Sequence, residues 1–466
     1  MSITSVYFRP HRWSPAYNPI VWSFISNKYT ETDMSYVVDL YVNGATGPTR
    51  TIKQRPNPAG VCMIDVSAIM QPYISMTNYA VENSSWPTAY GNSEDFVATV
   101  YLKVGEEYTD ANGNVIEENG NGATGAPAFA IYSEENPSTG PVRVIPAALP
   151  WQTGVDIMSS TTDYYFWSDY LMDGNGKFLK QQGNSIDVYS YDNSSLAWLN
   201  WWDNGAIYQR AVQLIQVKQY NASGSLLRTD NIQNTTAVGG GPQTNSVYTS
   251  QVENIDTDIL YFKSGPKNLQ DASIWDNTTA YYTVQAFAKA SGTSNPAPGA
   301  AASELVTYNV LEDCNFLYPR VRVSWLNELG GRDYWNFTML YDKSTRSPGD
   351  EYFQTPLNWS GQRPVAVSGV DANLSVNFMR GGAKSFNKNV FQRFAIQSDW
   401  LTQDEVDLLG NISQSPQVWC YIGTDNTPET VQVMNIDYTY KLVKQVKLVQ
   451  ATLELMYTKV QQKQNM

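Results

Sequence analysis

The sequence predicts a mainly β protein with a multidomain β-sandwich or β-barrel-like architecture and one short helix in its C-terminal domain. Three observations lead to this fold class. Hydrophobic and polar residues alternate in many short runs, which is the two-residue period of a strand. Residues that favour strands are abundant, with 31 Tyr and 14 Trp. The chain also has 31 Gly and 23 Pro, which are typical of turns between short strands.

The length of 466 residues is enough for about three domains of ~150 residues each. We expect residues 1–30 to form an extended proline-rich arm, because Pro10, Pro15 and Pro19 block regular structure. This arm is long enough to reach a neighbouring subunit. Three domains follow it: an N-terminal β domain at 31–145, a central β-sandwich of immunoglobulin or fibronectin type at 146–313, and a C-terminal β-rich domain at 314–466.

Within the first domain, alternation predicts a strand that ends at Asn43-Gly44, a strong hairpin signal. Asp65 or Ser67 is a candidate cap for a short helix that Pro72 ends. The expected segments are strands at 36–42 and 96–104, a helix within 64–73, an exposed hairpin tip at 110–128 and a linker at 141–150.

The one clear helix lies in the C-terminal domain. Thr402 is its expected N-cap, Glu405 completes a capping box, and Gly410 follows its last turn. Val406 and Leu409 would face the core. Elsewhere we expect strands at 163–170, 206–218, 281–290, 304–311, 418–422, 431–436 and 446–457, a turn at 221–224 and a flexible loop at 291–302.

The most informative segment is VRVSWLNELGGRDYWNF, residues 321–337. Two alternating runs flank Gly330-Gly331, where a positive φ has no steric cost for glycine. We expect paired strands with Trp325 and Phe337 buried. If φ is positive at Gly331, the substitution Gly331→Val should cost ~1–3 kcal/mol.

Charge and composition exclude some functions. The formal net charge is −13, from 44 Asp+Glu against 31 Lys+Arg, so the chain repels a phosphate backbone. We therefore expect no direct nucleic-acid binding. Charged residues are only 16% of the chain, below the ~25% of an average protein. Such a Tyr-rich, weakly charged surface suits protein contacts. We expect no signal peptide and no membrane span, because no apolar run approaches ~18 residues.

Side chains for common catalytic chemistry are scarce. His11 is the only histidine, which argues against a histidine base and against a zinc site. Cys62, Cys314 and Cys420 have no metal or redox spacing, and their odd number argues against a disulfide framework. We expect free thiols, no enzymatic activity, and no catalytic, metal or cofactor-binding residues.

Two segments are similar to the opening of a calcium loop, at 110–114 (DANGN) and 173–176 (DGNG). In the first, Val115 and Asn121 stand where a calcium loop needs glycine and glutamate. Both segments are therefore interpreted as turns.

Residues 198–203 (WLNWWD) offer tryptophans that could stack on a sugar ring. Adjacent Trp201 and Trp202 in a strand would face opposite sides, so one of them is expected in the core. A glycosidase would need two carboxylates at a fixed separation, which sequence alone does not reveal. We expect no nucleotide binding, because the chain has no Walker motif.

Three blocks of the chain resemble one family, the virion ring, neck and tail proteins of crAss-like and related tailed phages that infect Bacteroidetes. The first block holds WSPAYNPI, YVVDLYVNG, PNPAG and IDVS; the second is WLNELGGRDYWNF; the third holds SDWLT, SPQV and 438–448. They span the first 75 and the last 150 residues, and 145–310 is unmatched. The family has no catalytic residues to carry over.

The resemblance implies a structural subunit of a phage particle. We expect a homo-oligomeric neck or tail ring that contacts portal-proximal or tail components. Its location would be the virion, assembled in the cytoplasm of the host bacterium. A receptor-binding or glycan-binding tail protein is the alternative, and a polysaccharide hydrolase is a third hypothesis.

Overall fold

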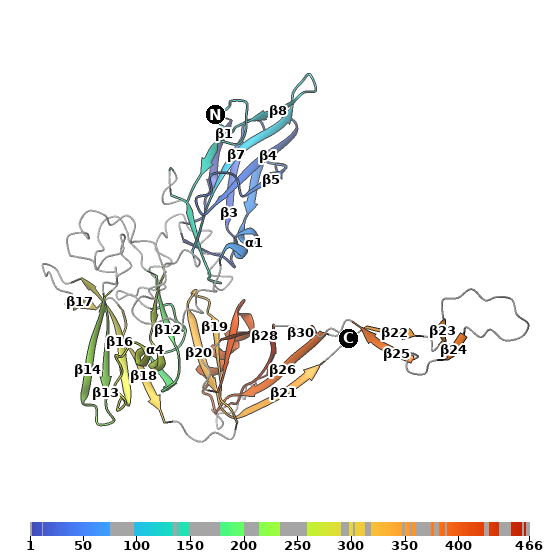
Figure 1. The fold of residues 1–466 in the computed structure, drawn as a ribbon. Helices are drawn as coiled ribbons and strands as arrows, with labels where there is room; N and C mark the ends of the chain where they lie inside the picture. The colour runs from blue at the N-terminus through green and yellow to red at the C-terminus, as the bar shows by residue number, and fades with distance from the viewer. Residues whose placement is uncertain are drawn as a thin grey trace, which may run out of the picture.

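The computed structural model consists mostly of antiparallel β-sheets arranged in three domains along the chain (Figure 1). The predicted mainly β fold class is confirmed. No helix in the described part of the chain is long and apolar enough to cross a membrane. The structure describes residues 2–11, 13–74, 97–133, 138, 140–148, 178–199, 214–233, 259–289, 298–301, 303–312, 318–346, 350–354, 357–359, 374–376, 382–386, 389–423, 428–437, 449–458 and 461–462.

The N-terminal domain contains a three-stranded and a seven-stranded sheet. The first has the order β1 (Ile3–Phe8), β3 (Val21–Ser26), β6 (Val61–Asp65). The second contains β2 (Trp13–Pro15), β10 (Val142–Ile145), β7 (Ala98–Thr109), β4 (Thr32–Val42), β5 (Arg50–Gln54), β8 (Val115–Glu118) and β9 (Phe129–Ile131). Helix α1 (Ser67–Met70) and the 3-10 turn η1 (Gln71–Tyr73) follow β6.

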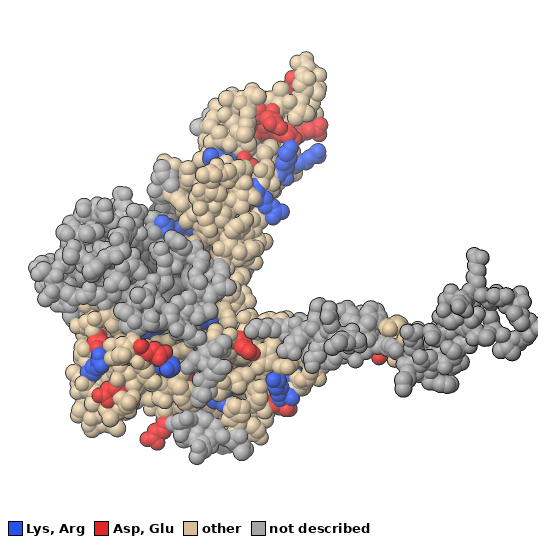
Figure 2. Space-filling model, in the orientation of Figure 1, with Lys and Arg blue, Asp and Glu red and all other residues tan. Residues whose placement is uncertain are grey.

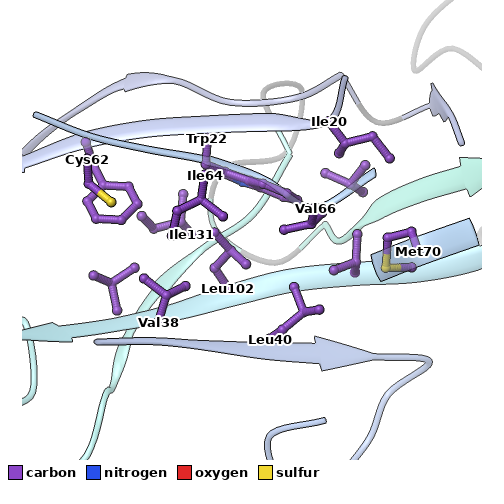
Figure 3. Close-up of a cluster of buried hydrophobic side chains, with 14 of the residues drawn as sticks. Ile20, Trp22, Val38, Leu40, Cys62, Ile64, Val66, Met70, Leu102 and Ile131 are labelled. Atoms are coloured by element: carbon purple, nitrogen blue, oxygen red, sulfur yellow. The ribbon is translucent and has the colours of Figure 1, made fainter. Parts of the chain in front are cut away.

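Hydrophobic side chains of both sheets fill one core (Figure 3). Trp22 and Ile64 come from the small sheet, and Val38 and Leu102 come from the large one. Alternation along β4 and β7 places every second residue in this core. The predicted helix after Ile64 is present as α1, and the side chain of Asp65 accepts a hydrogen bond from the backbone N–H of Ser67.

Two expectations about the first 150 residues are wrong. Residues 1–30 do not form a free arm, because they contain β1, β2 and β3, and Trp22 and Phe24 are fully buried in the domain's own core. The prolines lie at strand ends and turns, where a missing N–H costs little. The expected linker at 141–150 contains β10, whose alternating valines are buried between β2 and β7.

The middle domain combines a six-stranded and a two-stranded sheet around one core. Strands β11 and β18 form a parallel pair, and the stacked rings of Tyr282 and Tyr308 lie in the core. The elements are β11 (Ser185–Tyr189), β12 (Ser195–Leu199), β13 (Leu214–Tyr220), β14 (Leu226–Gln233), β15 (Ile259–Lys263), α4 (Pro266–Asp271), β16 (Tyr281–Lys289), β17 (Pro298–Ala301) and β18 (Val306–Leu311).

Most sequence expectations for the middle domain hold where they can be compared. Asn221 and Gly224 form the predicted turn, with a positive φ at Gly224. The expected loop at 291–302 is partly wrong, since 298–301 pair with β16 as β17. The expected strand at 163–170 and the first half of that at 206–218 lie outside the described residues.

The C-terminal domain is an eight-stranded sheet covered by helix α5 (Gln403–Gly410) and the 3-10 turn η6 (Asn411–Gln414). Both halves of the predicted capping box are formed, and Val406 and Leu409 are buried. Gly410 does not end the helix in a left-handed conformation, because the chain continues into η6. The strands are β19 (Val321–Leu326), β20 (Arg332–Phe337), β21 (Leu340–Arg346), β26 (Asn389–Gln397), β27 (Val418–Ile422), β28 (Glu429–Asp437), β29 (Thr452–Tyr457) and β30 (Gln461–Gln462).

Beyond β21 and β26 the chain continues as a two-stranded ribbon that projects away from the three domains (Figure 1). No sequence signal predicted it. Tyr352 and Phe353 are both exposed on the ribbon, although adjacent strand residues face opposite sides. Both faces of the ribbon are therefore uncovered at this point. Its strands are β22 (Asp350–Gln354), β23 (Leu357–Trp359), β24 (Leu374–Val376) and β25 (Gly382–Phe386).

Burial of the first strands in the N-terminal core has a measurable consequence. Replacing Trp22 by Ala should cost about 3–5 kcal/mol of unfolding free energy, because it removes a fully buried indole and leaves a cavity. Tyr7→Ala, on an exposed position of β1, is the control and should have little effect. Urea denaturation of the two variants measures the difference. Equal stabilities would mean that residues 1–30 contribute nothing to the core.

Candidate functional site at the joint of three domains

The segment singled out in the sequence forms the predicted hairpin. Strands β19 and β20 pair antiparallel with Val321 opposite Phe337 and Leu326 opposite Arg332. Trp325 and Phe337 are both buried in the core of the C-terminal domain, as expected. Strand β19 also pairs with β27, so the hairpin is anchored in the sheet.

Asn327 organises the turn of this hairpin. Its side-chain Oδ1 accepts hydrogen bonds from the backbone N–H groups of Leu329 and Gly331, at 3.0 and 2.9 Å. Its own backbone N–H donates to the carbonyl of Gly331 at 3.0 Å. Gly330 completes the turn with φ +88°, a conformation that costs glycine little. The residues WLNELGG therefore supply the side chain and the glycines that form one tight turn.

The other two domains contact this turn. The backbone N–H of Ala148, at the end of the N-terminal domain, donates to the carbonyl of Glu328 at 3.0 Å. From the same turn, the Asn327 amide donates to the carbonyl of Leu179 in the middle domain, also at 3.0 Å. A single turn thus bonds to segments that lie far apart in the sequence, and it forms the joint of the three domains.

Close packing, and not its backbone φ angle, is the reason that residue 331 must be glycine. The condition set for Gly331→Val, a positive φ at Gly331, is not met, since that conformation belongs to Gly330. A Cβ added to Gly331 would lie only 2.7 Å from the carbonyl carbon of Leu179. The middle domain approaches the turn so closely that only a residue without a side chain fits.

Asp333, in the C-terminal domain, bonds to the middle domain. Its buried carboxylate accepts hydrogen bonds from the backbone N–H of Gln181, at 3.1 Å, and from the Asn327 amide, also at 3.1 Å. Burial raises the pKa of Asp333 to about 6, and these hydrogen bonds and the charge of Lys180 oppose the rise.

Asp192 makes the reciprocal contact from the middle domain. Its carboxylate forms ion pairs with the guanidinium groups of Arg320 and Arg322, both on the C-terminal domain, and all three side chains are buried. The Arg322 pair measures 2.9 Å. The Asn336 amide donates to the same carboxylate at 3.0 Å.

Several other guanidinium donors also have partners, whereas Nε of Arg320 has none among the described residues. Arg322 donates to the Ser194 hydroxyl at 2.6 Å, and Arg320 donates to the carbonyl of Gly423 at 2.9 Å. Tyrosine rings lie against both cations, with the Tyr191 centroid 4.4 Å from Arg320 and the Tyr334 centroid 4.8 Å from Arg322. These partners matter because an unpaired buried charge is costly.

The carboxylates of Asp192 and Asp333 bond to guanidinium groups, backbone N–H groups and side-chain amides, and these contacts fix the geometry of the joint. Among the described residues, no group of three His, Cys, Asp or Glu side chains could hold a metal ion. The contacts described at the joint hold the domains together.

The other candidate residues of the sequence are not brought together. His11 is buried in the N-terminal domain, where its carbonyl accepts a hydrogen bond from the Ser14 hydroxyl. Cys62 and Cys420 are free buried thiols in two different cores. Burial raises the pKa of Cys62 to about 12 and raises that of Cys420 as well. Both thiols are thus protonated and unreactive at neutral pH. Cys314 lies outside the described residues.

The first calcium-like segment is a turn, as expected. The Asp110 carboxylate accepts hydrogen bonds from the backbone N–H groups of Asn112 and Asn114, which lower its pKa. The segment 173–176 and residues 200–203 of the tryptophan-rich stretch lie outside the described residues, while Trp198 is part of β12.

Sequence reasoning missed Asp192, Arg320 and Arg322 as joint residues. One signal was present: Arg322 stands between Val321 and Val323 in a strand whose residues are all buried. A charged residue at such a position needs a buried partner of opposite charge. Comparison with family models and with curated proteins found no match to this chain.

The close approach at Gly331 predicts a strong effect of one methyl group. Gly331→Ala should destabilise the protein by about 1–3 kcal/mol or more, because the added Cβ overlaps the backbone at Leu179. Gly47→Ala is the matched control, since a Cβ there meets no atom within 4 Å. Thermal unfolding and limited proteolysis between the domains compare the two variants. A tolerated Gly331→Ala would show that the joint can open at no cost.

Burial of Asp333 predicts a pH dependence with a definite sign. Because the folded protein binds this proton more tightly than the unfolded chain, the stability contribution is full below the ordinary value of 3.8 and is lost as the pH rises through about 6. The cost of Asp333→Asn should therefore be larger at about pH 4 than at about pH 7. Urea denaturation of both proteins at the two pH values measures it, and a cost that is equal or larger at neutral pH would contradict the assignment.

Proposed function

We propose that this chain is a structural subunit of a phage virion, a ring protein of the neck or tail that assembles with portal-proximal or tail components. The motif that carries the family resemblance supports this proposal most directly. Its Asn327, Gly331 and Asp333 hold the middle domain against the C-terminal domain. A subunit that transmits force within a particle needs domains held at fixed angles.

The surface and the ribbon add support. On the face shown in Figure 2, most of the described surface is neither acidic nor basic, and the charged residues of both signs lie interspersed. Such a surface suits contacts with other proteins. The ribbon that begins at β22, and not residues 1–30, is the segment suited to reach a neighbouring subunit. It extends from the body and exposes Phe353. An isolated two-stranded ribbon is only marginally stable in water, so a neighbouring subunit is its natural support.

An enzymatic role has no comparable support. Among the described candidates, the two thiols are buried in apolar cores, and His11 is buried in the N-terminal domain. We propose that the chain has no catalytic activity and carries no cofactor. A purified protein that cleaved a capsular polysaccharide, and lost this activity on replacement of one Asp or Glu, would instead establish a hydrolase.

Assembly state is the direct test of the ring proposal. The purified chain, or the chain in mature particles, should form a closed ring of one copy number, measured by native mass spectrometry and electron microscopy. A trimer at the tail tip would favour a receptor-binding protein, and a dispersed monomer in mature particles would contradict the proposal.

A ribbon variant sharpens this test. Replacing residues 347–388 by a short Gly-Ser link should weaken ring formation and leave the body folded, because the ribbon projects away from the domains. Circular dichroism checks the fold. As a matched control, Tyr7→Ala removes an exposed aromatic from another part of the surface and should assemble normally.

A further inference from the structure

A cavity of about 600 Å³ lies between the middle and C-terminal domains, beside the joint. Its size falls within the ~300–1,000 Å³ typical of ligand sites. Strand β11 contributes one wall, the end of β20 another, and the start of helix α5 a third. Because Asp192 and Asp333 fix these two domains to each other, the cavity has a defined shape.

Aromatic side chains form part of the lining. Trp335 is half-buried, and Trp400 is 59% exposed, which is unusual for an indole. The backbone holds Trp400 in place: its N–H donates to the Asp399 carboxylate at 2.7 Å, and the N–H of Leu401 donates to the carbonyl of Val449 at 2.8 Å. An exposed indole on a backbone held by these bonds can receive a ligand on its face.

Two side-chain amides of the lining already donate to protein groups. The Gln182 amide donates to the carbonyl of Tyr334, and the Asn336 amide donates to Asp192. Acceptors remain free. Asp404 has no hydrogen-bond or ion-pair partner among the described residues, and Asp187 and Asp399 each have one carboxylate oxygen without a bonded donor there.

The charge of the lining has one sign. Asp187, Asp399, Asp404 and Glu405 line the cavity, and no Lys or Arg is among the described residues that line it. Lys180 lies nearby, but its ammonium group is bonded to the carbonyls of Gln182 and Gly183 and to the Asn184 side chain. The cavity therefore offers acceptors, negative charge and aromatic faces together.

We propose that this cavity binds an arginine or lysine side chain of a basic segment on a partner protein. A guanidinium or ammonium group only donates hydrogen bonds, which matches the free carboxylate oxygens of Asp187, Asp399 and Asp404. It also gains from the indole face of Trp400. A neutral sugar would gain nothing from the negative charge of the lining, whereas a cation would. The identity of the partner as another virion protein rests on the function proposed above, whereas the binding chemistry does not.

The test uses the full-length protein and a fluorescein-labelled Ser-Gly-Arg-Arg-Gly-Ser peptide, followed by fluorescence polarisation. The control peptide carries citrulline in place of arginine, which keeps the shape and removes the charge. We expect the arginine peptide to bind at low salt and to weaken in about 0.5 M salt, because exposed charges are screened there. The citrulline peptide should bind at least roughly tenfold more weakly, as the ion pairs are lost.

Two variants locate the site. Trp400→Ala and Asp404→Asn should each weaken binding of the arginine peptide by roughly threefold or more. Matched controls are Tyr7→Ala and Glu31→Gln, which remove an exposed aromatic and an exposed carboxylate far from the cavity and should leave affinity unchanged. All four positions are exposed, so each variant should fold, which thermal unfolding verifies.

Several outcomes would overturn the proposal. Equal binding of the arginine and citrulline peptides, no binding of either, or equal effects of the site and control variants would each do so. Binding of cellohexaose that depends on Trp400, without binding of the arginine peptide, would make the cavity a glycan site. Assembly is measured separately. A protein that forms a ring but does not bind the peptide would contradict only the cavity proposal. A monomer that binds the peptide would contradict only the proposed ring.

Discussion

Two buried carboxylates hold the middle and C-terminal domains together by reciprocal contacts. Asp192 belongs to the middle domain and pairs with Arg320 and Arg322 of the C-terminal domain. Asp333 belongs to the C-terminal domain and accepts backbone N–H groups of Gln181 and Gln182 from the middle domain. Each domain thus contributes one buried carboxylate that bonds to groups of the other domain. The hairpin turn packs against Leu179 between these two contacts.

Buried ion pairs of this kind stabilise little, because removing charges from water costs about as much as their attraction returns. Their stronger effect is on specificity. Any rotation of one domain would leave a buried charge without its partner, which is far more costly than losing an apolar contact. The turn at Gly331 adds a steric limit to the same motion. A fixed angle between domains follows, and the proposed role in a ring and the shaped cavity beside the joint both depend on it.

Local sequence patterns predicted much of the fold. Alternation located β4, β16, β18 and β27, and the capping box located α5, because these signals depend only on neighbouring residues. The same dependence on neighbouring residues makes the prediction of a free arm at 1–30 wrong. Prolines indicate local irregularity, but burial of Trp22 depends on β4 and β7, which come later in the chain. The ribbon beyond β21 had no signal that distinguishes a projecting hairpin from one within a sheet.

The sequence by itself determined the β architecture, the hairpin around Gly330 and the burial of Trp325 and Phe337, since periodicity and turn chemistry are local properties. Only the tertiary structure decided why Gly331 must be glycine and why Arg320 can be buried. The partners of these residues are Leu179 and Asp192, and the Asp192–Arg320 pair is separated by 128 positions. No local pattern encodes such a pairing, because it exists only once two separately folded domains have met.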